Sequence, residues 1–240
     1  MEFWDVVRIF AVDENLSLNA GSWTDGCTAP LERFLMAQLL RFFKPSILVE
    51  IGTYRGTTTR MLLENAPSDA HIYTIDLPLD VDARDVAASS DERLIKHRQV
   101  GAEFRSHPRA RHITQILGNT MDAATWQEVP EGVGFAFIDG SHSYEAVRND
   151  TERLRTRLRS DAVILWHDYT ETVSAERGVG RYLRELMAEK DNIFICPETD
   201  LAFEVPRKAL LEGVERVPTW HPSGDYFQRR PHGPAPWLKR

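Results

Sequence analysis

The chain has 240 residues, 42% of them hydrophobic and 27% charged, which is the balance of a soluble globular protein with one sizeable core. Its net charge of -7 at pH 7 opposes the field of a phosphate backbone and argues against a nucleic-acid partner. No apolar stretch reaches the roughly 18 residues of a membrane span, and the N-terminus lacks the regions of a signal peptide, so we expect a cytoplasmic protein without a membrane partner.

The first predicted elements alternate between helix and strand. Residues 31–43 carry a broad helical stripe of apolar residues that ends before Pro45. Residues 46–52 form a short, branched apolar run that stops at glycine, as a buried parallel strand would. Residues 57–65 again have spacing compatible with a helix, so this part of the chain is predicted to be helix, strand, glycine turn and helix.

The same alternation continues downstream. Four more strand-like runs end at polar residues or glycine, and these are residues 71–76, 113–118, 135–139 and 162–168. Such runs are typical of buried parallel strands. Between the last two, apolar positions at steps of three and four residues predict an amphipathic crossover helix, with Tyr144, Val147, Thr151, Leu154 and Leu158 on its apolar side.

The sheet is predicted to finish with a hairpin. After a helix over residues 182–188, the runs 192–196 and 201–205 are separated by Pro-Glu-Thr-Asp, a spacing suited to antiparallel strands. Residues 211–240 are rich in proline and aromatic residues and lack periodicity, which predicts a tail that is disordered or lies on a surface.

These elements predict one domain over residues 1–210. It consists of an N-terminal helical segment, 1–45, and a core, 46–205. In open α/β sheets, ligands bind beyond the carboxyl ends of the strands, so the polar residues that end these runs are the candidates for a site.

The first candidates follow three successive strands. Gly52 and Gly56 allow a sharp turn before a helix whose first N–H groups are unpaired. Asp76 ends the next strand, where its carboxylate would accept both hydroxyls of a ribose or cap the following segment. Asn119 follows the third strand, where it would bind a base edge or begin a helix.

The next two strand ends each carry an aspartate and a histidine. Asp139 is followed by His142, and His167 is followed by Asp168. Two neighbouring carboxylates can converge on one divalent cation, and a nearby histidine can act as a general base. The alternatives are a turn at Asp139 with a serine capping the next helix, and a histidine at position 167 that is part of the core edge.

Two further segments are open to interpretation. Residues 93–112 are crowded with Arg, Lys and His, which favours a solvated helix face over a wall for an anionic acceptor. Residues 21–30 precede the first long helix, where they could help to close a ligand pocket.

The segments VEIGTYRGTTT, YTIDLP, LGNTMDA, FIDGSHSYEAVRND and VILWHDY together resemble the class I S-adenosylmethionine-dependent methyltransferases. The resemblance is to the bacterial small-molecule group that includes macrolide-sugar O-methyltransferases and cephalosporin-hydroxylase-like proteins, and it covers about residues 31–205. It implies an α/β, Rossmann-like fold with a seven-stranded, mostly parallel sheet, one antiparallel strand and helices on both faces. It also implies methyl transfer from S-adenosyl-L-methionine to a small-molecule acceptor, at a hydroxyl group.

The resemblance assigns roles to individual residues. Those that would bind the cofactor are Glu50, Gly52, Thr53, Tyr54, Gly56, Thr58, Asp76, Asn119 and Asp139. In this scheme the glycine loop holds the methionine part, Asp76 the ribose and Asn119 the adenine.

The resemblance likewise implies a catalytic group. His142 matches the base, and Asp139 and Asp168 match ligands of a divalent metal ion, magnesium or similar. His167 stands where metal-dependent relatives usually have another carboxylate, and as a third ligand its imidazole would suit softer ions than magnesium.

Two rival functions share this fold. One is a hydroxylase-associated protein that resembles methyltransferases, and the other is a module that binds the cofactor without transferring methyl groups. A nicotinamide dehydrogenase fits less well because GxGxxG is missing after the first strand. A homo-oligomer is compatible with each of these functions.

Overall fold

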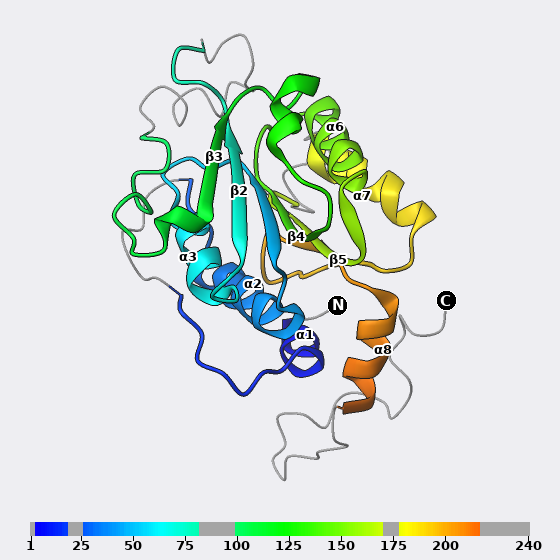
Figure 1. Ribbon diagram of the computed structural model, residues 1–240. Coiled ribbons are helices and arrows are strands. Elements are labelled where there is room, and N and C mark those ends of the chain that lie inside the picture. Colours follow the sequence, from blue (N-terminus) through cyan, green and yellow to red (C-terminus); the bar gives the residue numbers. More distant parts are fainter. Residues whose placement is uncertain (1–2, 19–25, 82–98, 170–177, 217–240) are drawn as a thin grey trace.

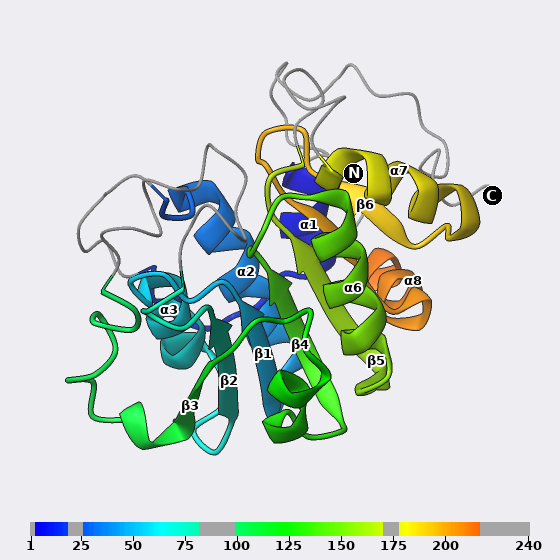
Figure 2. The same cartoon turned by 90° about the horizontal axis from the view of Figure 1, so that it is seen from above.

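A computed structural model describes residues 3–18, 26–81, 99–169 and 178–216 of the chain (Figure 1). A seven-stranded sheet with strand order β3-β2-β1-β4-β5-β7-β6 lies between two layers of helices (Figure 2). The predicted Rossmann-like architecture is therefore confirmed.

The strands match the predicted runs, with small shifts at their ends. They are β1 (Ile47–Ile51), β2 (His71–Asp76), β3 (Ile113–Leu117), β4 (Val133–Ile138), β5 (Leu158–Trp166), β6 (Ile193–Ile195) and β7 (Ala202–Glu204). The pairs formed among β1 to β5 are parallel, whereas β7 runs antiparallel to both β5 and β6. The predicted hairpin and the single reversed strand are both present.

Helices cover both faces of the sheet. They are α1 (Phe3–Ile9), α2 (Pro30–Phe43), α3 (Thr57–Asn65), α6 (Tyr144–Arg155), α7 (Gly178–Glu189) and α8 (Arg207–Arg216), with the 3-10 turns η1 (Ala110–His112) and η2 (Ala123–Glu128). One buried cluster joins α1, α2, α3 and α8 to the sheet, and a second joins α6 and α7 to its other face. Among the described residues, no helix combines the length and apolar character needed to cross a membrane.

Two predicted boundaries differ from the structure. Leu158 was predicted to lie on the crossover helix, but α6 ends at Arg155 and Leu158 pairs with Val133 in the sheet. Sheet pairing outweighs helical spacing there because the chain turns immediately after α6. The predicted domain end at residue 210 falls inside α8, and residues 217–240 of the predicted tail lie outside the described residues.

The ends of β1 and β4 meet at the point where the strand order reverses. β2 lies on one side of β1 and β4 on the other, and ligand sites form at such switch points. Gly52 has a φ of 96°, and a Cβ at this position would overlap the carbonyl oxygen of Asp139. Only glycine combines this backbone conformation with such a close approach of a second chain segment.

A buried acid lies within β1. Glu50 is 0% exposed, and its Oε2 accepts hydrogen bonds from the hydroxyls of Thr59 and of Thr74, the latter at 2.6 Å. Burial raises the pKa of Glu50 from 4.5 to about 8, although both hydroxyl donors lower it. The side chain is therefore largely protonated at neutral pH.

Replacing Gly52 with alanine should lower the free energy of unfolding by more than about 2 kcal/mol, because backbone strain adds to the overlap with Asp139. Gly132→Ala is the matched control, since Gly132 also has a positive φ, of 84°, but its Cβ would meet only Ile47 Cδ1 at 3.8 Å. That control should lose only about 1–2 kcal/mol. Chemical denaturation measures both, and equal losses would show that the overlap at Asp139 relaxes without cost.

The stability of the protein should fall as the pH rises from about 4.5 to about 8, because Glu50 ionises in the unfolded chain before it does in the folded one. The contribution is at most about 1.4 kcal/mol per pH unit. Glu50→Gln, which mimics the protonated acid, should reduce this slope. A smaller fall should remain, since burial also raises the pKa of Asp150, to about 6. Unfolding curves at several pH values test this, and parallel pH profiles would contradict it.

Candidate active site

A cavity of about 560 Å³ opens at the carboxyl ends of the parallel strands. Ten predicted site residues line it, namely Gly52, Thr53, Tyr54, Thr58, Asp76, Asn119, Asp139, His142, His167 and Asp168. Two others are not among its lining residues. Glu50 is buried within β1, and Gly56 caps α3 with its backbone against the ring of Phe104.

Asp76 fixes the loop that follows β1. Its Oδ2 accepts a hydrogen bond from the amide of Tyr54 at 2.7 Å, and its Oδ1 accepts one from the amide of Leu77, also at 2.7 Å. Tyr54 adopts a φ of 46°, which is uncommon for a residue with a side chain. Because an ionised carboxylate has about four acceptor positions, Asp76 can hold the loop and still accept hydroxyl groups of a ligand.

Threonine hydroxyls connect this loop to its surroundings. Thr53 Oγ1 lies 2.6 Å from Thr74 Oγ1, and Thr58 Oγ1 lies 3.2 Å from Thr28 Oγ1. Next to Thr28, residues 26 and 27 also line the cavity, so part of the predicted closing segment 21–30 contributes to its wall. Residues 21–25 lie outside the described residues.

Asn119 forms the turn that follows β3. Its Oδ1 accepts a hydrogen bond from the amide of Met121 at 3.0 Å, and its carbonyl accepts one from the hydroxyl of Thr125 at 2.7 Å. Asn119 therefore initiates a local turn, whereas the cap of the following 3-10 turn η2 is Asp122, and the contact of Asn119 with a base edge stays a prediction at a position that lines the cavity.

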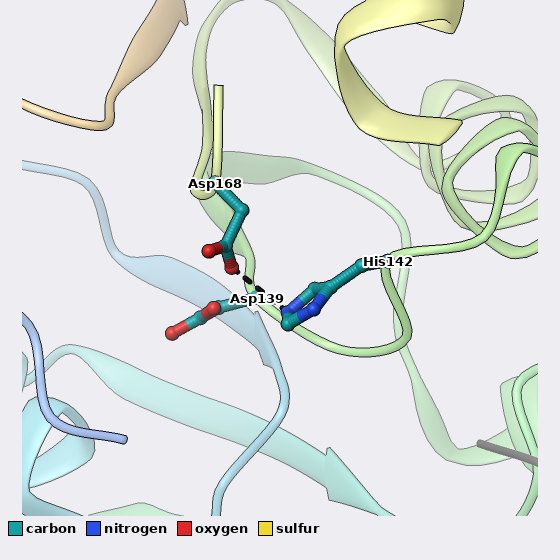
Figure 3. A group of neighbouring side chains, drawn as sticks. All are labelled: Asp139, His142 and Asp168. Atoms are coloured by element: carbon teal, nitrogen blue, oxygen red, sulfur yellow. Dashed lines mark ion pairs between the residues drawn. The ribbon is translucent and has the colours of Figure 1, made fainter. Parts of the chain in front are cut away.

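Asp139, His142 and Asp168 come together at the ends of β4 and β5 (Figure 3). One potential ligand atom from each lies within 4.8 Å of the others, and His142 Nε2 lies 2.8 Å from Asp168 Oδ2. The Nδ1 atom of His142 is buried, so Nε2 is the nitrogen available at this group. The hydroxyl of Ser143 accepts a hydrogen bond from the amide of Ala146 at 3.2 Å, so the turn and helix cap exist alongside the acid–histidine group.

His167 is surrounded by carboxylates. Its Nε2 lies 3.1 Å from Glu32 Oε2, and its Nδ1 lies 3.1 Å from Asp168 Oδ2 and 3.3 Å from Asp139 Oδ1. Each ring nitrogen thus faces a carboxylate, and the role of His167 as a metal ligand stays a prediction. The structure brings His142 into the group with Asp139 and Asp168.

The charges of the group follow from these contacts. Burial would lower the pKa of His167, but Asp139, Asp168 and Glu32 raise it well above its ordinary value. Burial would raise the pKa of Asp168, but hydrogen bonds from His142 and His167 lower it. The pKa of Asp139 is raised by burial. His167 thus carries a positive charge among acids.

Glu32 was not predicted as a site residue. It lies in the first turn of α2 and is 2% exposed, far from His167 in the sequence. In the sequence it stands within the apolar stripe of a helix, where nothing distinguishes it from an ordinary first-turn acid.

The acid–histidine group has the chemistry of a divalent metal site. Two carboxylate oxygens and one imidazole nitrogen are a donor set that divalent ions accept, with water completing the shell. The carboxylates of Asp139 and Asp168 therefore fit the predicted ion, and beside them lies His142 Nε2, a single nitrogen that can ligate an ion or accept a proton but not both.

The described part of the basic segment is occupied by structural contacts. Arg109 donates to the carbonyls of Leu63 and Pro67, both at 2.6 Å, and Arg105 donates to the carbonyl of Val100 at 2.8 Å. No residue of 99–112 lines the cavity, whereas residues 93–98 lie outside the described residues. The described residues of this segment therefore do not support the interpretation that it forms a pocket wall for an anionic acceptor.

Comparisons with known proteins agree with this geometry. The protein family described as "Methyltransferase domain" matches residues 49–169, just over half of the chain. A search of the curated proteins found no significant match.

Solved structures share the fold. The O-methyltransferase TomG from Streptomyces achromogenes, in complex with S-adenosylmethionine, is 17% identical, with a TM-score of 0.54 over 75% of this chain and 82% of that one. An O-methyltransferase from Bacillus cereus in complex with S-adenosylhomocysteine is 17% identical, with a TM-score of 0.53 over 85% and 90%. The methyltransferase PaMTH1 from Podospora anserina, bound to S-adenosylhomocysteine, is 15% identical, with a TM-score of 0.56 over 85% and 88%.

At these identities the structural neighbours establish the fold alone, and the family match establishes membership. The match spans the chain from β1 to the residue after Asp168 and so includes the glycine loop, Asp76 and the acid–histidine group. The chain therefore belongs to the methyltransferase domain family and is an S-adenosylmethionine-dependent methyltransferase with the class I fold.

Proposed function

We propose that this chain transfers the methyl group of S-adenosylmethionine to a hydroxyl of a small-molecule acceptor. The observation that carries this proposal is that seven of the nine predicted cofactor residues and the acid–histidine group, inferred from separate segments, line one cavity. Its volume of about 560 Å³ lies within the range of small-molecule and cofactor sites. The structural neighbours named as O-methyltransferases support the choice of a hydroxyl.

In this proposal the cofactor lies across the ends of β1, β2 and β3. The methionine part lies beside Gly52, which lines the cavity, and the fixed carboxylate of Asp76 accepts the ribose hydroxyls. The turn at Asn119 borders the adenine. The sulfonium methyl group then faces the ends of β4 and β5, where the acid–histidine group lies.

The reaction is a displacement in which the acceptor oxygen forms a bond to the methyl carbon. The carbon–sulfur bond breaks, its electron pair stays on sulfur, and S-adenosylhomocysteine leaves. His142 Nε2 takes the hydroxyl proton once the acceptor has displaced its 2.8 Å contact with Asp168 Oδ2, and the neighbouring carboxylates stabilise the imidazolium that forms. A divalent ion held by Asp139 and Asp168 would make the hydroxyl more acidic. Aligning the acceptor with the methyl group is the remaining task of the cavity.

Asp76→Asn should weaken binding of S-adenosylhomocysteine by about tenfold to a hundredfold, because it removes charge-assisted hydrogen bonds to the ribose. Isothermal titration calorimetry measures this affinity. Asp161→Asn is the matched control, because Asp161 lies on β5 with an exposed side chain and does not line the cavity. No binding by the wild-type protein would refute the proposed cofactor site, and unchanged affinity in Asp76→Asn would refute the role of Asp76.

His142→Ala should slow methyl transfer by about a hundredfold or more, because the acceptor hydroxyl loses its base. The assay follows transfer of labelled methyl from S-adenosylmethionine to a panel of phenols, sugars and other small alcohols. His112→Ala, in η1 and away from the cavity, should retain the wild-type rate. A variant at position 142 with full activity and an unchanged pH profile would rule out His142 as the base, whereas absence of any labelled product with the wild-type protein would argue against the proposed function.

A further inference from the structure

The buried acid Glu32 reaches the candidate active site from the far side of His167. It belongs to α2, on the face of the sheet opposite α6 and α7, and it does not line the cavity. Its Oε2 nevertheless lies 3.1 Å from His167 Nε2. A carboxylate that is 2% exposed requires strong compensating contacts, and this is one of them.

The remaining contacts of Glu32 hold its carboxylate in place. Oε2 also accepts a hydrogen bond from the amide of Ala29 at 2.6 Å, and Oε1 accepts one from the amide of Asp200 at 3.0 Å. Asp200 lies in the turn of the β6–β7 hairpin, and its carbonyl accepts a hydrogen bond from the amide of Tyr169 at 3.0 Å. Glu32 thus joins the start of α2 to the segment that directly follows Asp168.

His167 transmits this constraint to the two acids of the site. Ionised carboxylates only accept hydrogen bonds, so a ring with carboxylates at both nitrogens donates from both. Nε2 donates toward Glu32, and Nδ1 donates toward Asp139 and Asp168 at 3.3 and 3.1 Å. The two acids come from different strands, and the ring lies between the end of one and the end of the other.

This arrangement solves a physical problem of the site. Asp139 and Asp168 would repel each other when they share a small volume in a partly buried place. The Nδ1–H of His167 attracts both carboxylates toward one side, while His142 contacts Asp168 Oδ2 from another. Without a partner at Nε2, the ring would be held only by its contacts at Nδ1 and its packing against Phe137.

We propose that Glu32 is a positioning residue that acts through His167 to hold the carboxylates of Asp139 and Asp168 at the spacing required to bind one divalent cation. The inference rests on the proposed function, because it takes these two acids as the metal ligands. Outer partners of this kind change metal affinity by about tenfold to a hundredfold when they are removed.

The alternative role of Glu32 is purely structural, as the acid of a capping box in which it accepts from the amide of Ala29. The two roles predict different couplings. A cap would stabilise α2 whatever residue stands at position 167. A positioning residue would lose its influence on the metal site once His167 is replaced.

The test uses the full-length protein with Mn²⁺ as the probe. Free Mn²⁺ is measured by electron paramagnetic resonance, and S-adenosylhomocysteine binding is measured by calorimetry on the same samples. The variants are Glu32→Gln, His167→Asn and the double variant. Glutamine has a single acceptor oxygen, so it cannot serve the amide of Asp200 on one side and His167 on the other.

Glu32→Gln should weaken Mn²⁺ binding about tenfold and change the affinity for S-adenosylhomocysteine by less than about twofold. The double variant should bind Mn²⁺ no more weakly than His167→Asn alone, since the effect of Glu32 passes through the histidine. Glu32→Asp keeps both acceptor oxygens and is the milder variant if the amide prevents folding. It should show the same selective loss of Mn²⁺ affinity, about severalfold.

Glu204→Gln is the matched control. Glu204, on β7, is another buried acid. It pairs with Arg155 and Lys190 and does not line the cavity. This variant should lose stability but keep the Mn²⁺ affinity of the wild type. Wild-type Mn²⁺ affinity in the Glu32 variants, or an equal further loss when Glu32→Gln is added to His167→Asn, would overturn the positioning role.

One further outcome separates this inference from the function on which it rests. If the wild-type protein binds S-adenosylhomocysteine but no Mn²⁺, the metal part of the proposed function fails, and the inference that Glu32 prepares a cation site fails with it. If the wild type binds Mn²⁺ and the Glu32 variants bind it with the same affinity, the metal site stands. Only the role of Glu32 is then refuted. In a crystal structure of Glu32→Gln, the His167 ring should be displaced from its position in the wild-type crystal structure. A ring in the same position in both would count against the inference.

Discussion

The contact between the ends of β1 and β4 is the constraint on which the candidate site depends. The amide of Asp139 donates to the carbonyl of Ile51 at 2.8 Å, and the chain then passes so close to Gly52 that no side chain fits there. The loop for the cofactor and the loop that carries His142 therefore diverge from one point. This common origin sets the distance between the part of the cavity that would hold the cofactor and the part that would perform chemistry.

The alternation of side chains along the strands explains why the polar network lies on the α2 face. In β4 and β5, Phe137 and Leu165 belong to the buried cluster beneath α2 and α3. Two residues further along each strand, the same face carries Asp139 and His167. The periodicity that buries apolar residues within the sheet thus delivers an acid and an imidazole to the first turn of α2, just beyond the strand ends.

Most of the architecture could be predicted from the sequence because buried parallel strands leave a local signature. Short apolar runs that stop at glycine or a polar residue located the five parallel strands, and the loop after the hairpin strand β6 revealed the reversal. The end of α6 could not be predicted, because Leu158 continues the helical spacing while its pairing with Val133 is a contact between distant segments. The helix α8 was missed for a similar reason, since its sequence merges with a proline-rich tail.

In the candidate site, too, the features that follow from local sequence could be predicted, and those that depend on contacts between distant segments could not. Residues that end a strand, such as Asp76 and Asp139, could be identified because their position in the chain already places them at the edge of the sheet. The partners of His167 could not, because an imidazole beside a carboxylate in sequence gives no indication of which atoms its nitrogens face. The role of Glu32 is even harder to predict from the sequence, because its contact with His167 exists only after α2 has packed on the sheet.

The histidine at position 167 has a consequence for Glu32. With an acid at position 167, the buried carboxylate of Glu32 would face a like charge, and burial of both would be strongly unfavourable. With the imidazole there, the two residues form a buried ion pair, and removal of either takes away the oppositely charged partner that the other has at 3.1 Å. The two residues are therefore physically a single unit. A histidine at this strand end and an acid in the first turn of α2 therefore belong together in this chain.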